Sequence, residues 1–369
     1  MTGTGTSGVA KGVSWASLME VDTGMKIRVV QEASPIKELL FVKDGQMFAA
    51  SISYTAMTDL LDGREGYASA QLGPFPVRAL WVHDLSNAGF FVRGDSSIKT
   101  IYDIRPGTRF AVWDLRWSTL RWCRAFLKWV QLDEKDIVWF DAGTTNAAVR
   151  AVMDGRADIM FFFPIAPQMY EAAAAPHGIR FLDLNSDKDP EGAKRMMADF
   201  PGTTTVFGPI TSGPEGAVGH WGTVTYKLMY TREASDPELV YHFVKWLDEN
   251  YAKYKDTYDT NRYMSIDHVR QAMEGTFIPV HEGLIRYLKE KGLWTEALES
   301  RNQANLAALN TRVEAYKGAL AEAGKKGITV DPNNEAWLDF WEKYKEEHKV
   351  SPVAPIPTPT PTPTAASTR

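Results

Sequence analysis

The sequence predicts an α/β protein made of two similar lobes. The passages 42–52 and 152–163 are almost alike: each ends a helix, makes an Asp-Gly turn and continues as a short apolar strand. The turns at Asp44 and Asp154 lie 110 positions apart, too far for a solenoid repeat. Strand and helix patterns also alternate through the first half of the chain, as they do in parallel α/β units. This arrangement favours a two-lobed ligand-binding protein over a catalyst.

Composition limits the function. The chain has 369 residues and 44% hydrophobic content, which is enough for two or three domains with their own cores. A net charge of −5 with scattered Lys and Arg offers no basic patch, so we expect no nucleic-acid partner. No window approaches 18 consecutive apolar residues, so we expect no membrane-spanning segment.

Two further features concern the cell compartment and thiol chemistry. Cys123 is the only cysteine, which excludes an internal disulfide and a cysteine-based metal cluster. It lies in an apolar helix pattern, so we expect a buried, unreactive thiol. Residues 1–5 are of turn type and show no signal-peptide pattern. Taken alone, this start predicts a cytoplasmic protein, a processed chain or a misplaced start site.

The first elements follow from periodicity and turn residues. Val9, Val13, Ala16 and Met19 fall on one helical face. Pro35 suits the first turn of the next helix. We predict a loop at 3–8, a helix at 9–20, a strand at 26–31, a helix at 35–43, and strands at 49–53, 80–84 and 89–92.

The middle of the chain continues the alternation. Residues 97–112 predict a short helix that leads through Pro-Gly into a strand, and 119–130 form an amphipathic helix pattern. We predict strands at 137–140, 159–163, 179–184 and 223–230, helices at 144–153 (capped by Thr145 or Asn146) and 167–175, and a long loop at 199–222.

The last third is predicted to be helical. Leu306, Leu309, Val313, Tyr316 and Leu320 recur at a 3-4 spacing, which suits either a dimer seam or docking onto the chain's own core. Fewer than three heptads favours docking, and hence a monomer over a homodimer. We predict helices at 237–250 (started by Ser235 or Asp236), 266–274, 281–291, 295–323 and 334–347, then a disordered or polyproline-like Pro/Thr tail from Val350 that is a spacer or without function.

Four segments are predicted to line a ligand site, because ligands bind beyond the carboxyl ends of strands and beside helix N-termini. Alternative roles stay open for each: a plain loop for the first, helix capping for the second, pairing of Arg116 with Asp114 for the third, and core for Phe161 and Phe162 beside the fourth. Arg121 and Arg124 are expected on a solvated helix face. The candidate residues are Gly3, Thr4, Gly5 and Ser7; Ser51, Ser53 and Tyr54; Trp113, Arg116, Trp117, Ser118 and Thr119; Phe163 and Pro164.

Signatures of catalysis are missing from the sequence. The seven histidines are dispersed, and none forms a metal-binding pair such as H-E-x-x-H. No nucleophile elbow, P-loop or dinucleotide fingerprint occurs. We therefore predict no catalytic residues, no metal and no cofactor, with an enzyme or a ligand sensor on the same fold as the alternative.

Five passages together resemble a known family. They are Gly-Thr-Gly-Thr-Ser-Gly at 3–8, Asp44-Gly45 leading to Ser51-Ile52-Ser53, the segment 98–112, Asp-Gly-Arg-Ala-Asp at 154–158, and the passage 278–294. In this order they resemble the solute-binding proteins of TRAP transporters of the TAXI class, over roughly residues 3–300. The resemblance implies a two-lobed type II periplasmic-binding fold, with a helical C-terminal extension and the disordered Pro/Thr tail outside it.

The resemblance also implies a function and a division into lobes. The chain would be a periplasmic or extracytoplasmic receptor that passes a small organic-acid ligand to the membrane subunits of a TRAP permease. Lobe 1 would comprise residues 1–93 and 222–294, lobe 2 residues 94–221, the C-terminal helices 295–349 and the tail 350–369. His220 and Trp221 would join the ligand site, because the family's second hinge passes there. Hinges are expected near residues 93–96 and 211–221.

Three departures from the family pattern qualify this expectation. The usual first strand and its secretion signal are missing, and the tail lies outside the pattern. The segment 113–119 is bulky where the family is rich in Gly and Ser. Bulk and aromatic rings there favour an aromatic or apolar-bearing acid over glutamate.

Overall fold

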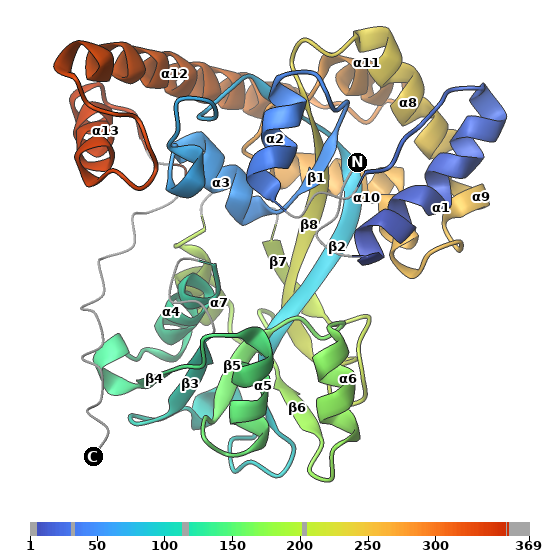
Figure 1. The fold of residues 1–369 in the computed structure, drawn as a ribbon. Helices are drawn as coiled ribbons and strands as arrows, with labels where there is room; N and C mark the ends of the chain where they lie inside the picture. The colour runs from blue at the N-terminus through green and yellow to red at the C-terminus, as the bar shows by residue number, and fades with distance from the viewer. Residues whose placement is uncertain (1–5, 31–33, 113–117, 201–204, 352, 354–369) are drawn as a thin grey trace.

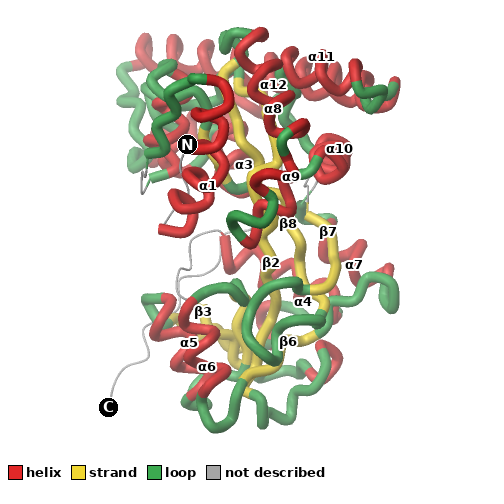
Figure 2. The backbone as a smooth tube through the Cα atoms, turned by 90° about the vertical axis from the view of Figure 1, so that its right-hand side faces the viewer, coloured by secondary structure: helices red, strands yellow, loops and turns green. Residues whose placement is uncertain are grey.

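The chain folds into two lobes connected by two long strands. The computed structural model describes residues 6–30, 34–112, 118–200, 205–351 and 353, apart from the side chains of residues 6–8, 55, 118 and 119. Strands β2 (Val77–Arg93) and β8 (Trp221–Arg232) run side by side from one lobe to the other (Figure 1). Figure 2 shows the same two strands between the lobes after a 90° turn. The predicted two-lobed α/β fold is confirmed.

Lobe 1, at the top of Figure 1, packs helices around one end of the β2–β8 pair. Its core joins apolar residues of α1, β1 and β8 with those of the later helices. The elements are α1 Thr6–Thr23, α2 Pro35–Lys43, β1 Ala50–Ile52, α3 Tyr54–Asp62, η1 Glu65–Tyr67, α8 Pro237–Glu249, α9 Tyr251–Tyr254, η4 Asp259–Met264, α10 Ile266–Gly275, α11 Glu282–Glu290, α12 Glu296–Lys326 and α13 Glu335–Glu347.

Lobe 2 has two cores, one on each side of its sheet. Cys123 is fully buried in one of them, and burial raises the pKa of its thiol, so the expected inert cysteine is confirmed. The elements are η2 Ile101–Asp103, β3 Arg109–Val112, α4 Ser118–Val130, η3 Glu134–Asp136, β4 Val138–Asp141, α5 Thr145–Met153, β5 Ile159–Phe162, α6 Pro167–Ala174, β6 Ile179–Leu182, α7 Pro190–Met197 and β7 Thr205–Pro209.

The sheet runs in the order β1-β8-β2-β5-β3-β4, with β6 also on β2 and β7 also on β8. Strand β2 pairs with β8 along most of its length and with β5 and β6 near its end. Along β8, residues 228–230 pair with β1 and residues 221–225 pair with β7. Tyr226 and Lys227 lie on β8 between the residues that pair with β1 and those that pair with β7.

The two Asp-Gly passages adopt the same backbone geometry. Asp44 ends α2 at φ −80°, ψ −4°, and Asp154 ends α5 at φ −82°, ψ −3°. The glycines that follow have φ +74° and +72°, the left-handed region that glycine enters without steric cost. Each turn then leads to a buried strand, β1 or β5. The predicted pair of helix–turn–strand units is confirmed.

Several predicted elements are wrong. Residues 26–30 form no strand, although Ile27 and Val29 do pack against the core, because none of the described strands pairs with them. The strands predicted at 80–84 and 89–92 are one strand, β2. The predicted loop 199–222 contains β7, which pairs with β8, and Thr144 rather than Thr145 or Asn146 caps α5.

The C-terminal helices pack onto lobe 1. Leu309, Val313 and Tyr316 of α12 are buried within the chain, which favours docking over a dimer seam. The indole Nε1 atoms of Trp337 and Trp341 in α13 donate to the carbonyls of Ala68 and Asp62. Among the helices that the structure describes, none is long and apolar enough to span a membrane.

Candidate functional site

Many predicted site residues lie outside the described part of the chain. Gly3, Thr4, Gly5, Trp113, Arg116 and Trp117 are in this group. Ser7 lies in the first turn of α1, and Ser118 and Thr119 in that of α4, but their side chains are not described. For these nine residues a ligand role stays a prediction.

The segment 51–54 lies where β1 ends and α3 begins. Ser51 is buried, and its Oγ lies 2.7 Å from Nδ1 of His83. Ser53 is the N-cap of α3 and accepts from the Ala56 N–H at 3.4 Å. Tyr54 is buried, with its ring edge-on to Phe277 at 5.1 Å. Helix capping is therefore one role of this segment, and Ser51 belongs to a polar group described below.

The end of β5 presents apolar surface. Phe163 is 40% exposed and Ile165 is 49% exposed, whereas Pro164 between them is buried. Phe161 and Phe162 are core, as expected. The tip of this strand is thus apolar, in contrast to the hydroxyl-bearing tip of β1.

His220 and Trp221 lie apart from the segment 51–54. They stand at the β7–β8 turn, where Asp183 accepts from the Trp221 N–H at 2.8 Å and lies 3.2 Å from His220 Nδ1. At about 3.3 Å per residue, Trp221 is roughly 20 Å along β8 from Lys227. A ligand role for these two residues stays a prediction.

Arg121 and Arg124 do not form the expected solvated helix face. Arg121 is half-buried, donates to the Asp199 carbonyl and lies over the Phe200 ring at 4.6 Å. Arg124 pairs with Glu134 at 2.6 Å. The expectation was wrong because α7 and the chain after it pack against α4, which the helix pattern alone does not reveal.

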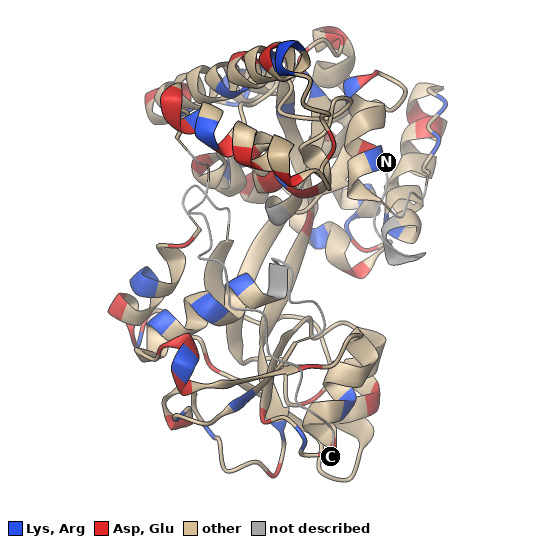
Figure 3. Cartoon of the chain, turned by 60° about the vertical axis from the view of Figure 1, so that its left-hand side comes forward, with Lys and Arg blue, Asp and Glu red and all other residues tan. Residues whose placement is uncertain are grey.

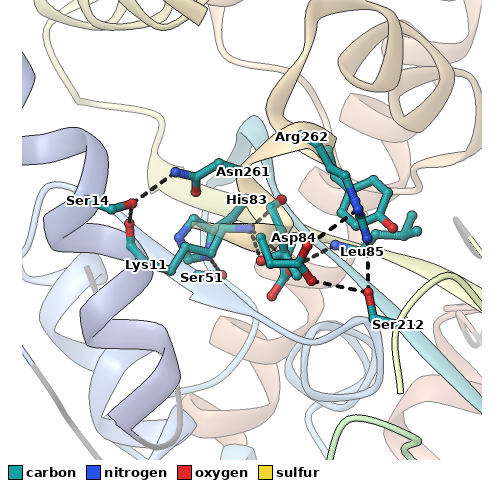
Figure 4. A network of polar contacts seen from close by, with 12 residues as sticks. Lys11, Ser14, Ser51, His83, Asp84, Leu85, Ser212, Asn261 and Arg262 are labelled. Carbon is teal, nitrogen blue, oxygen red and sulfur yellow. Dashed lines mark hydrogen bonds and ion pairs between the residues drawn. The ribbon is translucent and has the colours of Figure 1, made fainter. Parts of the chain in front are cut away.

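A polar group unanticipated by the sequence lies beside the stretch of β8 between its β1-paired and its β7-paired residues. We call Lys11, Ser51, His83, Asp84, Lys227 and Thr260 the hinge cluster. Figure 4 shows how α1, β1 and β2 bring part of this group together beside η4. Asp84 and Lys227 are cross-strand partners, and Ser51 pairs with Met229, two residues from Lys227. Because side chains alternate along a strand, these residues share the sheet face on which Lys11 of α1 lies.

Lys11 is the most buried charge of the cluster, at 1% exposure. Its Nζ donates to Asp84 Oδ1 at 3.2 Å, to the Thr260 carbonyl at 2.9 Å and to Thr260 Oγ1 at 2.8 Å. Burial lowers the pKa of Lys11 to about 8, against the opposing effect of Asp84. The predicted apolar face of this helix was partly wrong: Val13 is 44% exposed, and the buried face holds Lys11, Trp15 and Met19.

His83 is a neutral imidazole held in the same cluster. The β2–β8 register shifts between Val82 and Asp84, which makes His83 the extra residue of a β-bulge. It is 2% exposed, and burial, reinforced by Lys11 and Lys227, holds its pKa well below 6.5. Its Nε2 is buried and has no hydrogen-bond partner among the residues described.

Lys227 is a half-buried cation on β8. Within the described chain it forms no hydrogen bond and no ion pair, although Asp84 stands opposite it in the register. Burial lowers the pKa of Lys227, and the charges of Asp84 and Glu38 oppose this effect. An unpaired ammonium group next to the first turn of α3 is suited to an anion.

Polar contacts also join the lobes beside the cluster. Thr211, after β7, donates from its N–H and its hydroxyl to Asn87 Oδ1 at 3.3 and 3.2 Å. Its hydroxyl also bonds the Tyr263 hydroxyl of η4. Arg262 donates to Ser212 at 2.9 Å (Figure 4). These contacts couple lobe 1 to the segment that enters lobe 2.

A metal site, a second pocket and a charged surface patch are less well supported by the described residues. Among the side chains that the structure describes, no group of three His, Cys, Asp or Glu is placed to hold a metal ion. A surface hollow between α5 and α6, lined by residues such as Asn146 and Gln168, shares no residue with the hinge cluster. Lys and Arg are interspersed with Asp and Glu over both lobes (Figure 3).

Comparison with known proteins gives one family and several distant structures. A sequence profile of the NMT1-like family matches residues 3–292. No curated protein sequence matches the chain. Among solved structures, the periplasmic aliphatic sulphonate binding protein SsuA from Escherichia coli is 14% identical with a TM-score of 0.40, covering 100% of this chain and 96% of that one.

Two other solved structures are similarly distant. Substrate-binding domain 2 of Lactococcus lactis GlnP is 13% identical with a TM-score of 0.39, covering 68% of this chain and 83% of its own. The GluR0 ligand-binding core from Nostoc punctiforme, in complex with L-glutamate, is 15% identical with a TM-score of 0.36, covering 68% and 89%. The function is therefore argued from the residues of this chain.

Proposed function

This chain belongs to the NMT1-like family, and from that premise we propose that it is an extracytoplasmic receptor that captures a small organic anion between its two lobes. The observation that carries the proposal is Lys227, a half-buried ammonium group on β8 without a partner in the described chain. A carboxylate beside it would gain a charge-assisted hydrogen bond in a partly desolvated place.

Neighbouring groups support an anion at this point. The α3 helix begins after Ser53, and the first turn of a helix favours negative charge. His83 stays neutral and buried, so it adds a polar ring without a competing charge. The described carboxylate nearest in register, Asp84, already accepts from Lys11 and from the Leu85 N–H at 2.9 Å.

The rest of the ligand is proposed to be apolar or aromatic. Phe163 and Ile165 expose apolar surface at the tip of β5 in lobe 2. A ligand with a carboxylate at one end and a ring or alkyl group at the other would match a polar surface in lobe 1 and an apolar one in lobe 2. Strands β2 and β8 would act as the hinge when the lobes close on it.

Calorimetry with acetate, benzoate, phenylacetate and glutamate tests the proposal. We expect at least one apolar acid to bind, and we expect Lys227→Met to weaken binding by roughly ten- to a hundredfold, as for a lost hydrogen bond to a charged group. Lys227→Arg should retain part of the affinity. Lys99→Met, at an exposed lysine of lobe 2, is the matched control and should bind as the wild type does.

We further propose that the loaded receptor delivers its ligand to a TRAP-type membrane permease, on the resemblance of passages such as 278–294. Uptake of the bound acid into proteoliposomes that contain the permease subunits should require the receptor. The alternative is an enzyme or a ligand sensor on the same two-lobed fold. Turnover of a test compound without retention of any acid would favour the enzyme and contradict the receptor.

A further inference from the structure

The ammonium group of Lys11 is fully bonded within the protein and is not available to a ligand. The group has three protons, and three acceptors on Asp84 and Thr260 receive them. Lys11 is 1% exposed, so the charge is almost fully withdrawn from water. Burying a lysine costs several kcal/mol unless it is paired. A simple apolar residue at this position of α1 would avoid that cost.

The unexpected feature nearby is an ion pair that does not form. Asp84 and Lys227 stand directly opposite each other on β2 and β8, where Cβ atoms lie about 5 Å apart and opposite charges normally attract. Yet no ion pair or hydrogen bond joins them in the described chain. Asp84 Oδ1 instead receives Lys11 Nζ and the Leu85 N–H.

Resting on the proposed function, we infer that Lys11 is a positioning residue that occupies Asp84 and thereby keeps Lys227 free for the carboxylate of the ligand. Without Lys11, the Asp84 carboxylate would turn to the ammonium group facing it. The anion would then compete with an internal carboxylate for Lys227. Lys11 thus acts on the ligand through Asp84 and without touching it.

Other charges around the cluster do not replace Lys11 in this role. Glu38 of α2 is buried and acts on Lys227 only at longer range. Asp259 of η4 is exposed and pairs with Arg262 at 3.4 Å. His83 of β2 is neutral. Asp84 is therefore the described carboxylate best placed to capture Lys227.

A ligand-free NMR experiment measures the coupling between Asp84 and Lys227. The pKa of the Lys227 ammonium group is followed in the wild type, Asp84→Asn, Lys11→Met and the double variant. Removing Lys11 also removes its repulsion of the Lys227 ammonium group, which by itself changes the pKa of Lys227. The informative quantity is therefore the change in that pKa caused by Asp84→Asn, measured with and without Lys11. We expect Asp84→Asn to lower the pKa of Lys227 by about one unit or more in the Lys11→Met background, and by much less beside native Lys11.

An equal effect of Asp84→Asn in both backgrounds would overturn the inference, because Asp84 would then not be released by loss of Lys11. Lys11→Gln, which keeps a donor towards Thr260, replaces Lys11→Met if the methionine variant does not fold. His242→Gln, at an exposed site on α8, is the control and should leave the pKa of Lys227 unchanged.

Binding of benzoate provides the second readout. Lys11→Met should weaken benzoate binding at least about tenfold, and adding Asp84→Asn should restore most of it. If Lys11 only holds α1 in place, the loss will remain in the double variant, and the inference fails. If no acid binds even the wild type, the anion receptor of the proposed function fails, while the NMR cycle still decides whether Lys11 occupies Asp84.

Discussion

Burial keeps several histidines of this protein neutral. Burial lowers the pKa values of His83, His268 and His281 below 6.5. His281 caps α11, with Nδ1 accepting from the Gly283 N–H at 3.1 Å and Nε2 lying 3.1 Å from the Ser235 carbonyl. Because Nδ1 accepts a hydrogen bond in this geometry, the ring must be neutral.

These histidines predict a loss of stability in mild acid. The unfolded chain takes up a proton near pH 6.5 at each site, whereas the folded protein does so only at lower pH. The contribution of these histidines to the free energy of unfolding should therefore be fully present above pH 6.5. Below pH 6.5 the free energy of unfolding should fall by up to about 1.4 kcal/mol per pH unit for each histidine that stays neutral. Urea unfolding at pH 7.5, 6.5 and 5.5 measures this slope.

A variant pair identifies the source of the slope. His281→Gln removes one buried histidine and should make the fall between pH 6.5 and 5.5 shallower. His242→Gln removes an exposed histidine and should leave the slope unchanged. Identical slopes in all three proteins would show that the buried histidines do not control it.

At the scale of elements, the two Asp-Gly turns show how one local pattern serves two lobes. Gly45 follows α2 and Gly155 follows α5, and both have positive φ. Their surroundings differ: a Cβ on Gly45 would meet the Arg232 guanidinium at 2.2 Å, whereas on Gly155 the nearest atom is an Arg93 nitrogen at 3.5 Å. The need for a positive φ comes from the local turn, whereas the contact with Arg232 comes from the tertiary packing.

Alanine at each turn separates these two contributions. Gly155→Ala should lower the free energy of unfolding by about 1 kcal/mol, the cost of a left-handed conformation with a Cβ. Gly45→Ala should lose more, because Arg232 must also move. In an Arg232→Ala background, Gly45→Ala should lower the free energy of unfolding by the same amount as Gly155→Ala does. Urea unfolding measures these changes. An equal decrease in the free energy of unfolding for the two single variants would show that Arg232 moves aside without cost.

At the scale of the whole molecule, the lobes are joined by β2, by β8 and by the polar contacts of Thr211 and Ser212 with η4. The strands are continuous through both lobes and can bend. The polar contacts form and break one at a time. The balance between open and closed lobes should therefore depend on these contacts more than on either core.

Tyr263→Phe tests this dependence. The variant removes the hydroxyl that bonds Thr211, which should cost about 1 kcal/mol and shift the lobes towards the open state about fivefold. Single-molecule energy transfer between dyes at Lys99→Cys and Lys317→Cys reports the shift, and buried Cys123 should not take the label. Tyr251→Phe is the matched control, because its hydroxyl bonds Arg262 within lobe 1. A closed fraction that stays the same in Tyr263→Phe would contradict the prediction.

The sequence by itself determined the α/β class, the pair of lobes, the helix–turn–strand units at Asp44 and Asp154, and the inert Cys123. Periodicity and turn chemistry act over a few neighbouring residues, so a single sequence contains them. Only the tertiary structure showed that β2 is continuous, that β7 pairs within the predicted loop, and that Lys11 bonds Asp84 and Thr260, 73 and 249 positions away. The register between distant strands and the burial of charges depend on the packing of the whole chain. The residues of the hinge cluster are brought together by both, so the sequence alone could not reveal the cluster.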